Sequence, residues 1–271
     1  VILVIDCVKG VEEQTEKLMN VCRMRNTPVI VFINKLDREG RNPVELLDEI
    51  EDKLKIKVRP LSWPVGIGIS FRGVYNIFEN TFSFFRANKQ KIEKDIEMFK
   101  SSTDPKLKKL LGDDTVKLNE ELDLVNGIYG DFNTEDYLKG NIAPVFFGSA
   151  LNNFGVKELL DTFIKIAPGP QSRETTNGVI EPTNTSFSGF VFKIHANLDP
   201  KHRNRIAFLR VCSGKFERNK FYHHVRLNRD IKFPNPASFM AQDKTTIDEA
   251  FPGDVIGLYD VGNFKIGDTI T

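Results

Sequence analysis

Three short, continuous apolar runs constrain the fold of this chain more than any other feature. They are Val1–Ile5, Val29–Ile33 and Val145–Phe147, and a polar loop follows the second and third. Uninterrupted runs of this kind are typical of strands that are buried on both faces of a parallel sheet. The sequence therefore predicts a parallel sheet in which each of these runs is a strand.

Helical patterns separate the runs. Apolar side chains recur at helical spacing from Val11 to Cys22 and again over Gly155–Ala167. Between these segments, Asn42 and Pro43 have the pattern of an N-cap followed by proline at the first helical position. Alternation of strands and helices predicts an α/β fold whose parallel strands are joined by helical crossovers.

The loop after the second run carries an amide, an ammonium and a carboxylate, on Asn34, Lys35 and Asp37. A carboxylate only accepts hydrogen bonds, so Asp37 can take two parallel bonds from N1–H and the 2-amino group of guanine, a donor pair that adenine lacks. Asn34 can bond the base and tie neighbouring loops together, and the stem of Lys35 can lie along the base. This pattern indicates guanine recognition; the alternative is an ordinary polar surface loop.

A second loop follows the third run and contains Ser149, Ala150 and Leu151. Open parallel sheets bind ligands at the carboxyl ends of their strands, so both loops are expected at one site. There the Ala150 backbone N–H could donate to guanine O6, and Ser149 could brace Asp37. Together the two loops predict a site for the base of GTP or GDP.

The interval between the second and third runs is much longer than the dozen or so residues that a crossover needs. We therefore expect residues 58–140 to form a small α+β subdomain inserted into the sheet. The composition changes at Ala167-Pro-Gly-Pro170, which opens a polar linker over residues 169–185. Short strands divided by turns follow, and they predict a small antiparallel β-barrel over residues 186–271.

The chain is nearly neutral, with a formal net charge of +1 over 271 residues. Contact with RNA would therefore require a local basic patch. Such a patch is expected near one hairpin of the barrel, and the alternative is a solvated loop. Its members are Lys201, His202, Arg203, Arg205 and Arg210.

Other chemistry is not expected from this sequence. The three cysteines lack C-x-x-C spacing, and their sparse count fits a reducing, cytoplasmic compartment. The adjacent His223 and His224 would point to opposite faces of a strand, so a shared metal is not expected. No apolar run approaches the ~18 residues that cross a bilayer, and neither a membrane nor DNA is an expected partner.

Longer stretches carry a family resemblance. The two loops, with the long insertion and the barrel, resemble the translational GTPases. The insertion and Ser62-Trp-Pro-Val-Gly66 resemble elongation factor G and its close relatives. The segments Phe187–Arg203 and Arg205–Lys215 resemble the bacterial peptide chain release factor 3 family, which are class II release factors among the translational GTPases. The resemblance implies that residues 1–168 are a partial G domain. It also implies that GTP binding and hydrolysis eject class I release factors from the ribosome, with ribosomal RNA and proteins as partners.

One part of that family's machinery is absent from residues 1–271. The phosphate loop G-x-x-x-x-G-K-[ST], whose hydroxyl binds Mg²⁺, does not occur. We therefore expect a fragment that retains guanine recognition without catalytic residues or Mg²⁺ ligands, inactive by itself, and able to self-associate through the Val1–Ile5 edge. The alternatives are an elongation factor G-like GTPase and a non-enzymatic ribosome-binding module.

Overall fold

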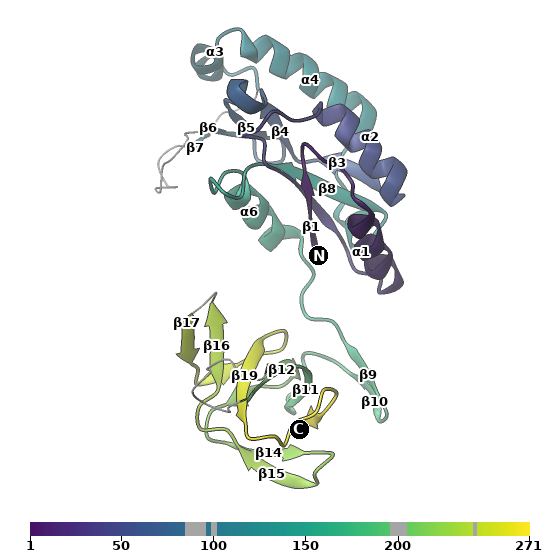
Figure 1. The fold of residues 1–271 in the computed structure, drawn as a ribbon, viewed down its shortest axis with the longest axis vertical. Coiled ribbons are helices and arrows are strands. Elements are labelled where there is room, and N and C mark those ends of the chain that lie inside the picture. Colours follow the sequence, from purple (N-terminus) through teal and green to yellow (C-terminus); the bar gives the residue numbers. More distant parts are fainter. Residues whose placement is uncertain (85–95, 99–101, 196–204, 241–242) are drawn as a thin grey trace. The chain divides into compact units, whose positions relative to one another are not determined.

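The computed structural model describes residues 1–84, 96–98, 102–195, 205–240 and 243–271 (Figure 1). The chain divides into two compact units, Val1–Ala167 and Pro168–Thr271. Each unit has its own sheet and its own buried core.

Unit 1 is built on a four-stranded parallel sheet in the order β1-β2-β8-β3. Its strands are β1 (Ile2–Asp6), β2 (Ile30–Asn34), β8 (Ile142–Phe147) and β3 (Lys57–Pro60). The three apolar runs are therefore parallel strands, as the sequence predicts. β1 is an edge strand with Val1, Ile2 and Val4 exposed, and self-association through this edge stays a prediction.

Side chains that alternate along β2 divide the core of unit 1 into two layers. Val31 and Ile33 pack on one face with α1 (Glu13–Met24) and α2 (Pro43–Leu54). Ile30 and Phe32 pack on the other face, where α5 (Thr134–Leu138) and α6 (Val156–Ile166) supply Tyr137, Leu159 and Ile166. Helices thus cover both faces of the sheet, and α6 lies across it from α1 and α2 (Figure 1).

The predicted helices form, with differences in their buried faces. Asn42 Oδ1 accepts the Val44 N–H at 2.8 Å, so α2 has the N-cap that its sequence indicates. In α1, however, Leu18 is 49% exposed and Met19 only 5%. The predicted helical stripe from Val11 to Cys22 therefore does not include Leu18, because α1 buries the face that carries Met19 and Cys22, and Val11 precedes the helix.

The insertion differs from its predicted extent. The sequence predicts that it begins at Val58, but β3 pairs with β8 in the main sheet. The charged stretch 88–121 has helical leucine spacing, and it contains a strand at Ile96–Met98 as well as helical segments. The inserted elements are β4 (Ser62–Val65), a short 3-10 helix (Gly68–Ser70), β5 (Gly73–Asn76), β6 (Thr81–Phe84), β7 (Ile96–Met98), α3 (Pro105–Leu111) and α4 (Asp114–Tyr129). The four strands form an antiparallel sheet in chain order.

Unit 2 contains a curled, eight-stranded antiparallel sheet around an apolar core, in agreement with the predicted barrel. The predicted linker is not featureless, because the hairpin of β9 (Arg173–Thr175) and β10 (Gly178–Ile180) lies within it. The eight strands, in spatial order, are β15 (Arg229–Lys232), β14 (Phe221–His224), β20 (Thr269–Ile270), β11 (Ser188–His195), β12 (Arg205–Ser213), β19 (Val255–Asp260), β16 (Ala237–Met240) and β17 (Asp243–Thr246). A further pair joins β13 (Phe216–Glu217) to β18 (Glu249–Ala250).

A buried carboxylate clamps two turns of unit 2 together. Asp268 accepts hydrogen bonds from Arg226 Nε at 2.6 Å and from the Lys265 N–H at 2.8 Å. The fully buried His224 has its Nε2 3.1 Å from Asp268 Oδ2, on the opposite strand face from the partly exposed His223, as predicted. The Arg226 hydrogen bond outweighs the effect of burial and lowers the pKa of Asp268 from 3.8 to about 2.

We expect Asp268 to make unit 2 more stable above pH 4 than at pH 2. Because its pKa is lowered on folding, the ionised form stabilises the fold, and this stabilisation is lost as pH falls through about 2. Asp268→Asn should lower the free energy of unfolding by about 2 kcal/mol at pH 7, measured by urea denaturation. Asp248→Asn, at an exposed ion pair, is the control. An equal loss in the free energy of unfolding for the two variants would contradict the stabilising role of Asp268.

Candidate nucleotide-binding site

The parallel register brings the ends of three strands to one edge of the sheet of unit 1. Asp6 at the end of β1 lies beside Asn34 at the end of β2, and Ile33 lies beside Phe147 at the end of β8. The loops that follow β2 and β8 therefore meet, as the sequence predicts for ligand loops in an open α/β sheet.

Leu36 anchors the first loop, between the polar residues of that loop. Its side chain is fully buried, whereas Asn34, Lys35 and Asp37 are only partly buried. Lys35 has a φ of 71°, a left-handed conformation that is uncommon for residues other than glycine. Asn34 Oδ1 accepts the Lys35 N–H at 2.8 Å and so helps to hold this turn.

Asn34 also joins the first loop to the second. Its Oδ1 accepts the Ala150 N–H at 2.8 Å. The Leu36 N–H donates to the Gly148 carbonyl at 3.2 Å, and the Gly148 N–H donates to the Ile33 carbonyl at 2.9 Å. The predicted role of Asn34 in tying the loops together agrees with this geometry.

Two expected contacts of the second loop have other partners here. The Ala150 N–H, expected to donate to guanine O6, donates to Asn34 instead, so a base would have to share or displace that bond. The fully buried Ser149, expected to brace Asp37, accepts a hydrogen bond from Asn152 Nδ2 at 2.9 Å. Asn152 is a contact that sequence reasoning missed. Leu151 is 87% exposed beside these residues.

The Asp37 carboxylate is available to a ligand. Within the described part of the chain, no hydrogen bond or ion pair of this half-buried side chain is recorded. Burial, together with the charges of Asp6 and Asp37, raises the pKa of the nearby Cys7 thiol to about 11. Cys7 is therefore a neutral neighbour, and both Asp37 oxygens can accept from a ligand such as guanine.

Asp6 belongs to the site, although sequence reasoning missed it. Its Oδ2 lies 2.5 Å from Lys35 Nζ. Burial disfavours the ionised form of Asp6, but the Lys35 hydrogen bond and the N–H groups of Val8 and Lys9 outweigh burial, and the pKa of Asp6 is lowered. A signal was present, because Asp6 is the first polar residue after the first apolar run, as Asn34 is after the second.

The glycine that opens the second loop is required by close packing. A Cβ on Gly148 would lie 2.2 Å from the Phe154 carbonyl oxygen and 2.7 Å from the Phe32 ring. Both are far inside normal contact distance. The loop that carries Ser149 and Ala150 can thus lie close against β2 only without a side chain at this position.

Of the five basic residues expected to contact RNA, the structure describes Arg205 and Arg210. Lys201, His202 and Arg203 lie outside the described residues. Arg205 and Arg210 stand five positions apart on the regular strand β12, so they point to opposite faces. Arg205 points to the inner face, with its Nε 3.8 Å from the buried Asp260, whereas Arg210 lies on the outer face.

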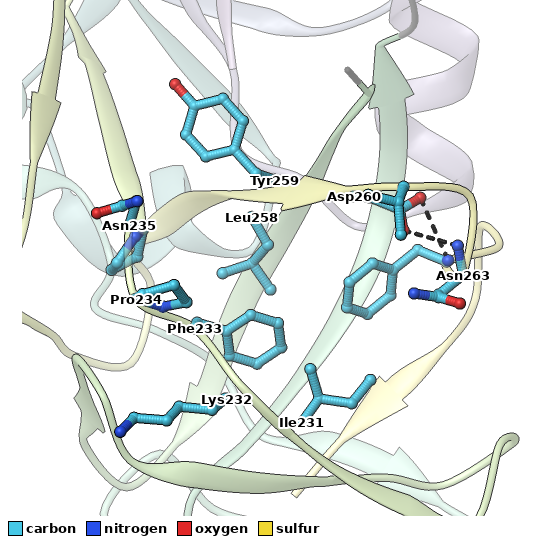
Figure 2. A pocket seen from close by; sticks show the side chains of 12 residues that line it. Ile231, Lys232, Phe233, Pro234, Asn235, Leu258, Tyr259, Asp260 and Asn263 are labelled. Atoms are coloured by element: carbon cyan, nitrogen blue, oxygen red, sulfur yellow. Dashed lines mark hydrogen bonds between the residues drawn. The ribbon is translucent and has the colours of Figure 1, made fainter. Parts of the chain in front are cut away.

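Unit 2 also contains a hollow of about 460 Å³ (Figure 2). Its apolar lining includes Phe233, Leu258 and Phe264. The carboxylate of Asp260 accepts the N–H groups of Asn263 and Phe264, so it is committed to holding a turn (Figure 2). These lining residues present an apolar surface without an evident catalytic group.

The described residues provide neither a metal-binding cluster nor a membrane-spanning helix. No cluster of three or more His, Cys, Asp or Glu side chains able to hold a metal ion occurs there. No helix among them has the length and apolar character needed to span a bilayer.

Comparison with protein families matches both units. The elongation factor Tu GTP binding domain matches residues 1–169, and elongation factor G domain 2 matches residues 186–271. The chain is thus a GTP-binding protein of the translation factor class. More particularly, it belongs to the elongation factor Tu GTP-binding domain family and is a translational GTPase.

We expect Asn34→Ala to loosen the second loop. The substitution leaves the N–H groups of Lys35 and Ala150 without their acceptor, which should lower the free energy of unfolding by about 1 kcal/mol and speed hydrogen exchange at the Ala150 amide. Exchange measured by NMR should stay slow in Asn34→Asp, which keeps the oxygen, and in Asn20→Ala on the exposed face of α1. Unchanged hydrogen exchange at the Ala150 amide in Asn34→Ala would contradict the role of Asn34 in holding the second loop.

Proposed function

We propose that the loops at Asn34–Asp37 and Ser149–Leu151 bind the guanine base of GTP or GDP. The observation that carries this proposal is the Asp37 carboxylate, half-buried with no recorded partner among the described residues, beside two loops joined through Asn34. The exposed Leu151 and the stem of Lys35 supply apolar surface for the base. Membership of a GTP-binding family supports the same assignment.

The guanine base fits the residues present, but the phosphates and Mg²⁺ do not. Residues 1–271 lack the glycine-rich loop whose backbone cradles phosphates and whose hydroxyl binds the metal. We therefore assign no hydrolytic step to these residues, and the 271-residue chain by itself should bind guanine nucleotides weakly without turning GTP over.

For the cellular role, we propose translation termination. The chain would act in a GTP-driven factor that promotes dissociation of class I release factors from the ribosome. The support is the resemblance of residues 187–215 to the release factor 3 family. A second candidate is an elongation factor G-like translocase, which the match of residues 186–271 to domain 2 of elongation factor G favours equally. A ribosome-binding module without activity is a third.

Ribosomal RNA contact is proposed for the outer side of unit 2. Arg210 supports it, because this side chain lies on the outer face of β12. Arg205 is a weaker candidate, since it lies beside the buried Asp260. Lys201, His202 and Arg203 are retained on their sequence alone.

We expect Asp37→Asn to change base selectivity. Asparagine offers one acceptor and one donor, which match N1–H and the 2-oxo group of xanthine but not the two donors of guanine. Guanosine affinity should fall by about tenfold or more, because a charge-assisted pair is lost, while xanthosine affinity rises. NMR titration measures the dissociation constants of guanosine and xanthosine. Adenosine is the nucleoside that should not bind, and Asp52→Asn, at an exposed position, is the control variant. Equal affinities for guanosine and adenosine in the unaltered chain would overturn the proposed base site.

The ribosomal role predicts salt-dependent binding. Lys201→Glu combined with Arg203→Glu should weaken ribosome binding and flatten its dependence on salt, because phosphate contacts release counterions. Arg229→Glu combined with Lys232→Glu, at two exposed positions of β15, is the charge-matched control. Binding should be tighter to ribosomes that hold a class I release factor at a stop codon than to ribosomes poised for translocation. The reverse preference would favour the elongation factor G-like alternative.

A further inference from the structure

Backbone N–H groups hold the Asp6 side chain in addition to its ion pair with Lys35. Its Oδ1 accepts the N–H groups of Val8 at 2.9 Å and Lys9 at 3.4 Å, and the Gly10 N–H donates to the Asp6 carbonyl at 2.8 Å. The side chain is 14% exposed. The turn after β1 therefore fixes one carboxylate oxygen and leaves Oδ2 pointing at the Lys35 ammonium.

Lys35 is correspondingly fixed at both of its ends. At the backbone end, Cys7 Sγ donates to the Lys35 carbonyl at 3.1 Å, and the Cys7 N–H donates to the Asn34 carbonyl at 3.0 Å. At the other end, the ammonium is held by Asp6. A lysine stem held at both ends has less rotamer freedom to lose when a ligand arrives.

We propose that Asp6 is a positioning residue of the guanine site, which holds the Lys35 ammonium so that the Lys35 stem is preorganised as one wall for the base. This inference rests on the proposed guanine-binding function. Asp6 does not touch the base. It acts through Lys35: the Lys35 ammonium pairs with Asp6, and the Lys35 methylene groups are free to pack against the base.

The test uses the 271-residue chain with guanosine as the probe. Asp6→Asn keeps an oxygen for the Val8 and Lys9 N–H groups and removes the charge that holds Lys35. It should weaken guanosine binding about threefold to fivefold, the range expected for a partly exposed ion pair. Lys35→Met keeps an apolar stem without the ammonium. In that background Asp6→Asn should have no further effect, because a double-mutant cycle isolates the interaction between the two residues.

A spectroscopic readout separates positioning from general stability. Guanosine stacked on the stem should shift the Lys35 methylene proton resonances upfield, and the shift should shrink in Asp6→Asn but stay in Asp6→Glu if the longer carboxylate still reaches the ammonium. Two results together would overturn the role of Asp6 while leaving the guanine site intact. Asp37→Ala would abolish guanosine binding, and Asp6→Asn would change neither the guanosine affinity nor the Lys35 proton shifts. Independent, additive effects of Asp6→Asn and Lys35→Met would also overturn the role of Asp6. Absence of guanosine binding by the unaltered chain would overturn the guanine site itself.

Discussion

The hydrogen bonds of one amide oxygen hold the candidate site together. Asn34 Oδ1 accepts from Lys35 in its own loop and from Ala150 in a loop more than a hundred residues later. This junction is possible because parallel pairing aligns the ends of β2 and β8 and because Gly148 lets the second loop approach. The arrangement of Asp37, Ser149 and Leu151 depends on that alignment.

Local signals in the sequence predicted much of this arrangement. The three apolar runs specify the strands, and the Asn42 cap specifies the start of α2. Both follow from short-range chemistry, because burial on two faces requires a continuous apolar run and a side-chain oxygen can satisfy a free N–H at a helix start. Burial on both faces holds for β2 and β8 but not for the edge strand β1, where Ile2 and Val4 are exposed. The two loops then follow from the topology of parallel strands.

Features that depend on distant contacts were harder to predict. The residues of β3 read as the start of the insertion because their place beside β8 is set by pairing across more than eighty positions. Asp6 was given no role from the sequence, because only the pairing of β1 with β2 shows that it meets Lys35. Arg205 and Arg210 point to opposite faces because of their odd spacing on β12. Which of the two turns inward depends on packing, and the buried Asp260 beside Arg205 indicates that face.

The insertion leaves and rejoins the main sheet at neighbouring points. The Leu61 N–H donates to the Val145 carbonyl at 2.9 Å, and Ser62 Oγ accepts the Phe147 N–H at 3.0 Å. The chain therefore leaves the main sheet beside β8, the same strand into which it returns at Ile142. Since the entropy of closing a loop grows only slowly with its length, a change in the length of this excursion costs little by itself. A change in its packing costs more, because Trp63 and Phe71 share the core of unit 1 and the Gly68 N–H donates to the Leu36 carbonyl of the first base-reading loop at 3.0 Å.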